Sequence, residues 1–209
     1  MSDKTFFDEM KRSFKDIPVD EHNQISTREF LEASSSLVKL FGMYLHHGTH
    51  LLGSAAFQVV VNDMNGNITK IQKRLAQNPE HSKTLQGMVL EETKDGGKKM
   101  GTQALLWLSR GLQFTEAAMR ETLDHPEKEM TETFTTAYKG TLIKYHSMFV
   151  RPIFKLAMKA CPYRKDFFAK LGKDQEKVSE QIREWVKALA GIVKIIMNFY
   201  ASGNYGRGL

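Results

Sequence analysis

The central stretch of this chain is Asp63-Met-Asn-Gly-Asn67-Ile-Thr-Lys70-Ile-Gln-Lys-Arg74. Its apolar residues recur at the spacing of one buried helix face: Met64, Ile68, Ile71 and Leu75. A polar set follows the same spacing one residue earlier: Asp63, Asn67, Lys70 and Arg74. Because one residue turns a helix by about 100°, the stretch predicts a helix on which a polar stripe borders the core.

This polar stripe combines an acid, an amide and two cations. Such groups can together hold a hydroxyl-rich ligand whose other end is buried. The simpler interpretation is a solvated helix edge, on which Asp63 and Lys70 only support the helix. The stretch by itself favours that simpler interpretation.

Composition narrows the class of protein. The chain has 209 residues, with 30 basic and 24 acidic side chains and a net charge of +6. This length predicts one domain (25–209). The first 24 residues carry apolar side chains among charges and are interrupted by Pro18, so they are expected to form a loosely attached N-terminal arm (1–24). The moderate positive charge suits an anionic membrane surface. The chain has no zinc-finger spacing, aromatic RNA-binding signature or long basic run, so no nucleic-acid partner is expected.

The expected location is the cytoplasm. Cys161 is the only cysteine, which excludes an intramolecular disulfide and fits a reducing compartment. The first 20 residues show no secretory signal, and no segment has the roughly 18 apolar residues of a membrane span.

Helical periodicity recurs along the chain, and no convincing strand alternation interrupts it. The expected helices cover about 26–41, 54–77, 79–93, 102–123, 131–160, 165–171 and 174–201. The 131–160 helix should be kinked by Pro152, and the 165–171 helix should close on Gly172. The pattern predicts an all-α fold of seven or eight helices.

Three histidines lie close together in the segment from Tyr44 to Leu51. His46 and His50 have the spacing at which two helical histidines share a metal ion. However, Gly48 interrupts the helix and no carboxylate or cysteine completes a ligand set. We therefore expect neither a metal site nor a cofactor.

Four motifs, in order along the chain, resemble the glycolipid transfer protein family. They are Asp63-Met-Asn-Gly-Asn67-Ile-Thr-Lys70-Ile, Leu106-Trp107-Leu108-Ser109-Arg110-Gly111-Leu112, Lys144-Tyr145-His146 and Ala160-Cys-Pro162-Tyr163-Arg-Lys-Asp166-Phe167. The resemblance spans residues 25–200 and is closest to the fungal branch, which includes a heterokaryon-incompatibility protein. It implies a two-layer all-helical sandwich of about eight helices that encloses a hydrophobic lipid pocket.

The resemblance also implies a function without catalysis: transfer or sensing of glucosyl-, galactosyl- or lactosylceramide through transient contact with a membrane surface. By position, Asp63, Asn67 and Lys70 would bind the sugar. Asp63 would also accept the ceramide amide N–H, and His146 would donate to the amide carbonyl. Trp107 would be the flat platform under the first sugar, and Tyr205 would assist at the headgroup.

The residue chemistry agrees with these roles. An amide that enters an apolar site needs both its donor and its acceptor matched, or it costs about 1–3 kcal/mol. An indole offers an apolar face to the C–H side of a pyranose. A further set matches family positions that line the hydrocarbon compartment: Phe57, Phe114, Leu142, Phe154 and Phe167. For each of these, and for Trp107 and His146 taken singly, ordinary core packing is the simpler interpretation.

Three alternatives stay open. Relatives that carry ceramide-1-phosphate place cations where this chain has Asn67 and Trp107, so a phospho-sphingolipid carrier of the same fold is the nearest one. A phosphate needs such charge, whereas a neutral amide and an indole favour a sugar. The second alternative is a hydrolase that uses Asp63 and His146, although the chain lacks a Gly-x-Ser-x-Gly elbow. The third is a helical interaction protein without a ligand.

Two features depart from the family pattern. The segment from Tyr44 to Leu51 looks like an insertion near the lipid entrance. Met148 stands where animal relatives place a membrane-docking tryptophan. Docking is therefore expected to depend on Phe149, on Lys155 and Lys159, or on the C-terminal tail.

Overall fold

The computed structural model describes residues 4–45, 51–94 and 96–209, and leaves undescribed the side chains of 43–45, 51–54, 56 and 57. Its long helices are α2 (Thr27–Leu45), α3 (Leu51–Gln77), α5 (Met100–Asp124) and α9 (Gln175–Ser202). The shorter elements are α1 (Phe6–Glu9), η1 (Phe14–Asp16), α4 (Leu85–Lys94), α6 (Met130–Gly140), η2 (Leu142–Tyr145), α7 (Val150–Lys159) and α8 (Arg164–Leu171). Within the described residues, extended pairing is limited to two isolated bridges, Val19 with Ile25 and Ser26 with Thr84.

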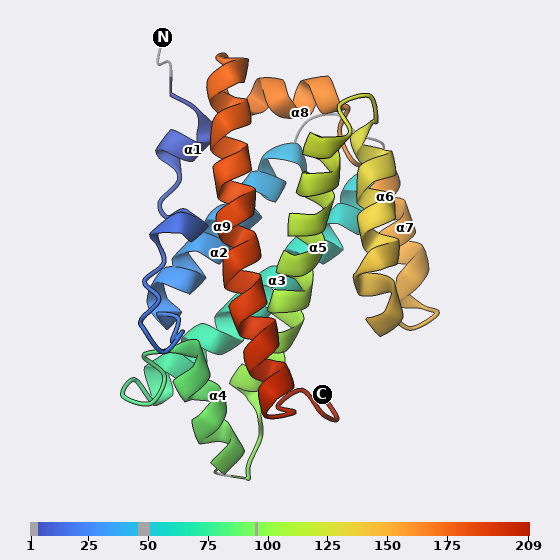
Figure 1. The fold of residues 1–209 in the computed structure, drawn as a ribbon. Helices are drawn as coiled ribbons and strands as arrows, with labels where there is room; N and C mark the ends of the chain where they lie inside the picture. Colours follow the sequence, from blue (N-terminus) through green and yellow to red (C-terminus); the bar gives the residue numbers. More distant parts are fainter. Residues whose placement is uncertain (1–3, 46–50, 95) are drawn as a thin grey trace.

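The helices form a two-layer sandwich. Figure 1 shows α9, α5 and α6 in front of α2 and α3, which cross behind them. Helix α5 packs against α3, α6 and α9, while α3 also packs against α2 and α7. The all-α prediction is confirmed. The expected central place of the 102–123 helix is also confirmed, because α5 contacts both layers.

Three of the four residues predicted on the apolar face of the central stretch are buried, and the fourth, Leu75, is partly buried. Met64 and Ile68 are each 3% exposed and Ile71 is fully buried, all on α3. Asp174 caps the last helix as its side chain accepts a hydrogen bond from the Lys177 backbone N–H. These elements formed as predicted because their apolar period is a local property.

The single helix predicted for 131–160 is wrong. The chain forms α6, η2 and α7 in its place. Thr141 leaves the helical conformation with φ −121° and ψ −78°. Pro152 does not kink a helix, because it is the third residue of α7, where an N–H would have no intrahelical acceptor.

Two other boundaries differ from expectation. The helix expected from residue 79 begins only at Leu85. Gly172 is extended rather than left-handed, with φ 161° and ψ 164°. Its lack of a side chain serves packing instead, since a Cβ there would lie 3.0 Å from both Thr5 Cγ2 and Val178 Cγ2.

The N-terminal arm is firmly attached, contrary to the expectation of a loose segment. Phe14 is 2% exposed, and its ring centroid lies 5.6 Å from that of Trp185 on α9. The Asp8 carboxylate accepts a 2.7 Å hydrogen bond from Lys177 Nζ. Aromatic burial and charged pairing both fix the arm to α9. The division into an arm (1–24) and one domain (25–209) stays a prediction.

Candidate functional site

The polar residues on α3 form the first part of the candidate site. Asn67 is only 5% exposed, and its Nδ2 donates a 3.3 Å hydrogen bond to Asp63 Oδ2. Asp63 reaches the surface, but the atoms packed around it raise the pKa of its carboxyl, and the positive charge of Lys70 opposes this rise. The stripe is therefore a linked acid and amide with a cation one turn away.

An arginine between two aromatic rings forms the second part of the site. The Arg110 guanidinium carbon lies 4.7 Å from the Trp107 ring centroid and 3.9 Å from that of Tyr145. Arg110 Nε is buried and has no hydrogen-bond partner among the described residues. Desolvation lowers the pKa of Arg110, and Tyr145 opposes this change. The cation thus backs the Trp107 indole.

His146, just after η2, completes the cluster. Its imidazole stacks on the Trp107 ring with centroids 6.4 Å apart and an interplanar angle of 12°. Its Nδ1 lies 3.1 Å from the Tyr138 hydroxyl, and its backbone carbonyl accepts a 3.0 Å hydrogen bond from Arg151 Nε. Burial lowers the pKa of His146, with a smaller contribution from the charge of Arg151. These contacts fix the orientation of the ring, and its surroundings disfavour the protonated form.

The polar residues of α3 and the aromatic cluster around Trp107 lie on two helices that pack against each other, α3 and α5. A Cβ on Gly101 would lie 3.2 Å from Arg74 Cγ, which gives the register. The helices run in opposite directions (Figure 1). Asn67 is seven residues before Arg74, and Leu108 is seven residues after Gly101. The two helices therefore pack on each other at Arg74 and Gly101, and the approach of the polar α3 residues to Trp107 stays a prediction.

Tyr205 has different surroundings from the other predicted headgroup residues. Its ring stacks on Phe199 with centroids 4.7 Å apart, and its backbone N–H donates to the Tyr200 carbonyl. The described contacts therefore tie Tyr205 to the end of α9. Its role at the headgroup stays a prediction.

Four of the predicted hydrocarbon-lining residues are core residues: Phe114, Leu142, Phe154 and Phe167. Tyr138 connects two of them to the polar site, since its ring lies 6.5 Å from that of Phe114 and stacks 5.4 Å from that of Phe154. The imidazole of His146 lies 4.3 Å from the Phe154 ring. The side chain of Phe57 lies outside the described residues.

The sequence analysis assigned no role in the site to two members of this cluster. Arg110 lies one turn after Trp107, a spacing that places the two side chains together on a helix. Tyr138 lies eight residues before His146 and carried no signal beyond its place on an apolar face. Only the turn between α6 and η2 brings the Tyr138 hydroxyl to the imidazole.

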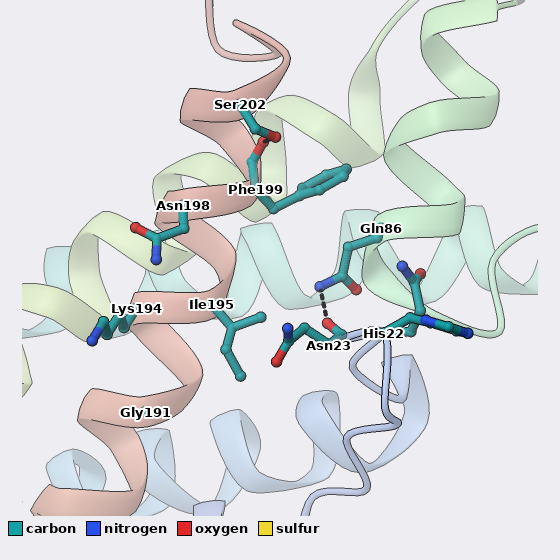
Figure 2. A pocket seen from close by; sticks show the side chains of 10 residues that line it. His22, Asn23, Gln86, Gly191, Lys194, Ile195, Asn198, Phe199 and Ser202 are labelled. Atoms are coloured by element: carbon teal, nitrogen blue, oxygen red, sulfur yellow. Dashed lines mark hydrogen bonds between the residues drawn. The ribbon is translucent and has the colours of Figure 1, made fainter.

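A pocket of about 590 Å³ lies elsewhere, between the 22–24 loop, α4 and α9. Figure 2 shows Ile195 and Phe199 projecting from α9 towards Gln86 and Asn23. Gln86 Nε2 donates a 2.7 Å hydrogen bond to the Asn23 carbonyl, which fixes the loop. This pocket contains none of the predicted headgroup residues, although Phe199 joins it to Tyr205.

Several other features limit the chemistry. Within the described residues, no group of three or more histidine, cysteine, aspartate or glutamate side chains could hold a metal ion. The histidine segment 46–50 lies outside that description. Cys161 is buried, and this burial raises the pKa of its thiol to about 12. None of the described helices has a stretch long and apolar enough to cross a bilayer.

The fold and the cluster define a helical lipid-binding domain: aromatic and polar groups meet at its surface above a buried apolar interior. The chain belongs to the glycolipid transfer protein (GLTP) family, which matches residues 25–173.

Individual relatives agree with this assignment. A glycolipid transfer protein of Aureobasidium melanogenum is 46% identical over 198 residues, covering 95% of this chain and 94% of the relative. The crystal structure of HET-C2, a fungal glycolipid transfer protein, is similar with a TM-score of 0.85 and 44% identity, covering 94% and 97% of the two chains. A GLTP-fold structure of FAPP2, which selects simple glycosphingolipids, has a TM-score of 0.83 and 28% identity, covering 97% and 96%.

Proposed function

We propose that this chain carries glycosphingolipids, with glucosyl-, galactosyl- or lactosylceramide as ligand, between membranes without chemical change. The observation that carries this proposal is the stack of His146 on Trp107, with Tyr138 at the imidazole Nδ1. It combines a flat apolar surface with an oriented hydrogen-bond donor. The similarity to HET-C2 and the FAPP2 domain supports the same ligand class.

The headgroup binds at the α3 stripe in this proposal. A sugar lies on Trp107, while Asp63, Asn67 and Lys70 hydrogen-bond its hydroxyls. The Asn67 Nδ2 hydrogen bond to Asp63 leaves the Asn67 carbonyl and the second Asp63 oxygen for the ligand. Tyr205 joins them if the tail moves off Phe199.

The ceramide amide is matched at both ends. The Asp63 carboxylate accepts the amide N–H. If the Tyr138 hydroxyl donates to His146 Nδ1, the neutral imidazole carries its proton on Nε2 and can donate it to the amide carbonyl. Phe114, Leu142, Phe154, Phe167 and Phe57 then line the compartment for the hydrocarbon chains.

The working compartment is the cytoplasm, and contact with the membrane is made by the turn that precedes α7. Met148 is 78% exposed and Phe149 is 85% exposed, large values for apolar side chains. Exposed Lys155 and Lys159 on α7 add positive charge beside them.

The test is transfer of fluorescent galactosylceramide between neutral vesicles, with ceramide-1-phosphate in parallel. We expect glycolipid transfer by the unmodified protein and its loss in Asp63→Val, because the amide N–H and a sugar hydroxyl lose their acceptor. Asp166→Val, which removes an exposed carboxylate on α8, is the matched control and should transfer normally.

Unchanged transfer by a folded Asp63→Val variant would contradict the site. Transfer of ceramide-1-phosphate alone would identify a phospho-sphingolipid carrier. Mass spectrometry of the recovered lipid checks the absence of chemistry, since cleaved product would point to a hydrolase.

A further inference from the structure

A second groove lies between the N-terminal arm, α2 and α8, and shares no residue with the candidate headgroup site. It consists of two adjoining pockets of about 370 and 400 Å³ that have Lys11, Ser36 and Lys39 in common. Gln72 and Leu75 of α3 close one end, and Leu171 and Gly172 close the other. The groove therefore exists only in the folded chain.

The groove is strongly basic. Five cationic side chains line it: Lys4, Lys11, Arg28, Lys39 and Lys170. Its two acidic side chains are Glu9 and Glu32. Clefts lined by charge of one sign concentrate the field and attract ions of the opposite sign.

Glu32 does not neutralise the whole groove. Its carboxylate is engaged by Lys11 Nζ at 2.8 Å and by Arg12 Nη2 at 3.2 Å. The hydrogen bond from Lys11, followed by that from Arg12, holds the pKa of Glu32 below its usual value. In the part of the chain that the structure describes, Arg28 and Lys39 have no carboxylate partner, although both line the groove with Glu32 on α2.

Tertiary contacts hold these cations together. Gln181 Nε2 donates a 2.8 Å hydrogen bond to Asp8 Oδ1, and Thr5 Oγ1 donates one of 2.6 Å to Gln181 Oε1. The close approach of Thr5 to Gly172 fixes the arm against the end of α8. Arg12 Nη2, which lies 3.2 Å from Glu32 Oε2, joins the arm to α2 as well, so the backbones that carry these cations are held around one groove.

We propose that this groove binds a multiply phosphorylated small group, either free or as the headgroup of an anionic lipid. Arginine pairs with phosphate through two parallel N–H donors, and lysine acts as a compact point charge. The Ser35 and Ser36 hydroxyls already donate to the Leu31 and Glu32 carbonyls. Recognition therefore rests on charge, which favours a ligand with several phosphates. The inference does not depend on glycolipid transfer.

The experiment measures binding of two probes to the full chain at low salt. Calorimetry with inositol hexakisphosphate tests the free ligand, with inositol as the uncharged control. Flotation with vesicles containing phosphatidylinositol 4,5-bisphosphate tests the lipid. The variant is Arg28→Ala with Lys39→Ala, and Lys98→Ala with Lys187→Ala removes the same charge from exposed positions elsewhere.

We expect the groove variant to lose at least about tenfold in affinity, because it loses two charge-assisted contacts, and the control to change little. Binding of either probe with this difference supports the groove, and the probe that binds identifies the source of the phosphate. Equal losses in both variants, or no binding of either probe, would overturn the proposal.

Two checks keep the result interpretable. If the double variant melts at a lower temperature than the control, Lys39→Gln alone tests the same loss, and normal binding by this variant would overturn the proposal. Transfer of galactosylceramide between neutral vesicles should be unchanged in the groove variant. A failure of the phosphate-binding proposal can therefore be distinguished from a failure of the glycolipid-transfer proposal.

Discussion

At the scale of single residues, Arg110 explains how an indole can be held at the surface in a fixed orientation. Its guanidinium lies over the Trp107 ring and over the Tyr145 ring at the same time. A cation–π contact is worth about 0.5–2 kcal/mol. Because Arg110 and the offset stack of His146 fix the ring, a sugar can bind the rest of the indole surface without a further cost in side-chain entropy.

We therefore expect Arg110→Ala to weaken binding of galactosylceramide by about fivefold, equivalent to about 1 kcal/mol. Arg110→Lys should recover part of the loss, because an ammonium keeps the charge and loses the planar stack. The measurement is quenching of Trp107 fluorescence in a Trp185→Phe background. If Arg110→Ala changed neither the affinity for galactosylceramide nor the Trp107 emission, the contact with Arg110 would not be needed to orient the Trp107 ring.

His146 gives a prediction about pH. Burial disfavours the imidazolium, so the pKa of His146 lies below the ordinary 6.5. Glycolipid binding should therefore stay constant from about pH 8 down to 6.5, and fall only in more acid solution. The unfolded chain takes up this proton more readily, so the same acidification lowers stability.

The check is an NMR titration of the imidazole C2 protons, with the His146 signal identified by its loss in His146→Gln. A midpoint above 6.5 would contradict burial as the dominant cause.

At the scale of elements, the N-terminal arm is part of the core. Phe14 is 2% exposed and packs edge-on against Trp185. Phe14→Ala should lower the free energy of unfolding by about 3–5 kcal/mol, because truncation removes the buried ring and leaves a cavity. Urea unfolding followed by Trp185 fluorescence measures this loss.

The neighbouring Lys15→Ala is the control. Lys15 is half exposed and makes a 3.6 Å surface ion pair with Glu184, so we expect a change of at most about 1 kcal/mol. Equal free energies of unfolding for the two variants would instead support the interpretation that the arm is loosely attached.

The turn between α6 and η2 is a second element on which the structure depends. A continuous helix would carry His146 two turns beyond Tyr138 on the same axis. The break at Thr141 instead folds the chain back, so that the Tyr138 hydroxyl reaches the imidazole. The site therefore depends on the element whose prediction was wrong.

At the scale of the whole molecule, two surfaces have different chemistry. The turn before α7 presents Met148 and Phe149, while the groove beside the arm presents lysine and arginine side chains. Proposed membrane docking uses the first surface and proposed phosphate binding the second. A net charge of +6 alone would not separate them.

Phe149→Ala should weaken binding to neutral vesicles by about tenfold or more, since full burial of such a side chain is worth about 1.5–3 kcal/mol. Glycolipid transfer should slow with it. Leu90→Ala, which shortens another exposed apolar side chain, is the control for sedimentation with vesicles. Equal binding by both variants would place docking elsewhere.

By itself the sequence determined the helical class, the apolar face of α3, the central place of α5 and the long helix α9. Each depends on apolar spacing within one segment, and this spacing acts on the helix that contains it. The residues Asp63, Asn67, Lys70, Trp107 and His146 were named from motifs, and their binding roles stay predictions.

Only the tertiary structure decided the attachment of the arm, the break after α6, the place of Arg110 between two rings and the basic groove. The physical reason is common to all four. Each depends on contacts between segments distant in the chain, as between Phe14 and Trp185 or Asp8 and Lys177. These features are stabilised by burial and pairing between distant segments, and the apolar spacing within one segment does not predict such contacts.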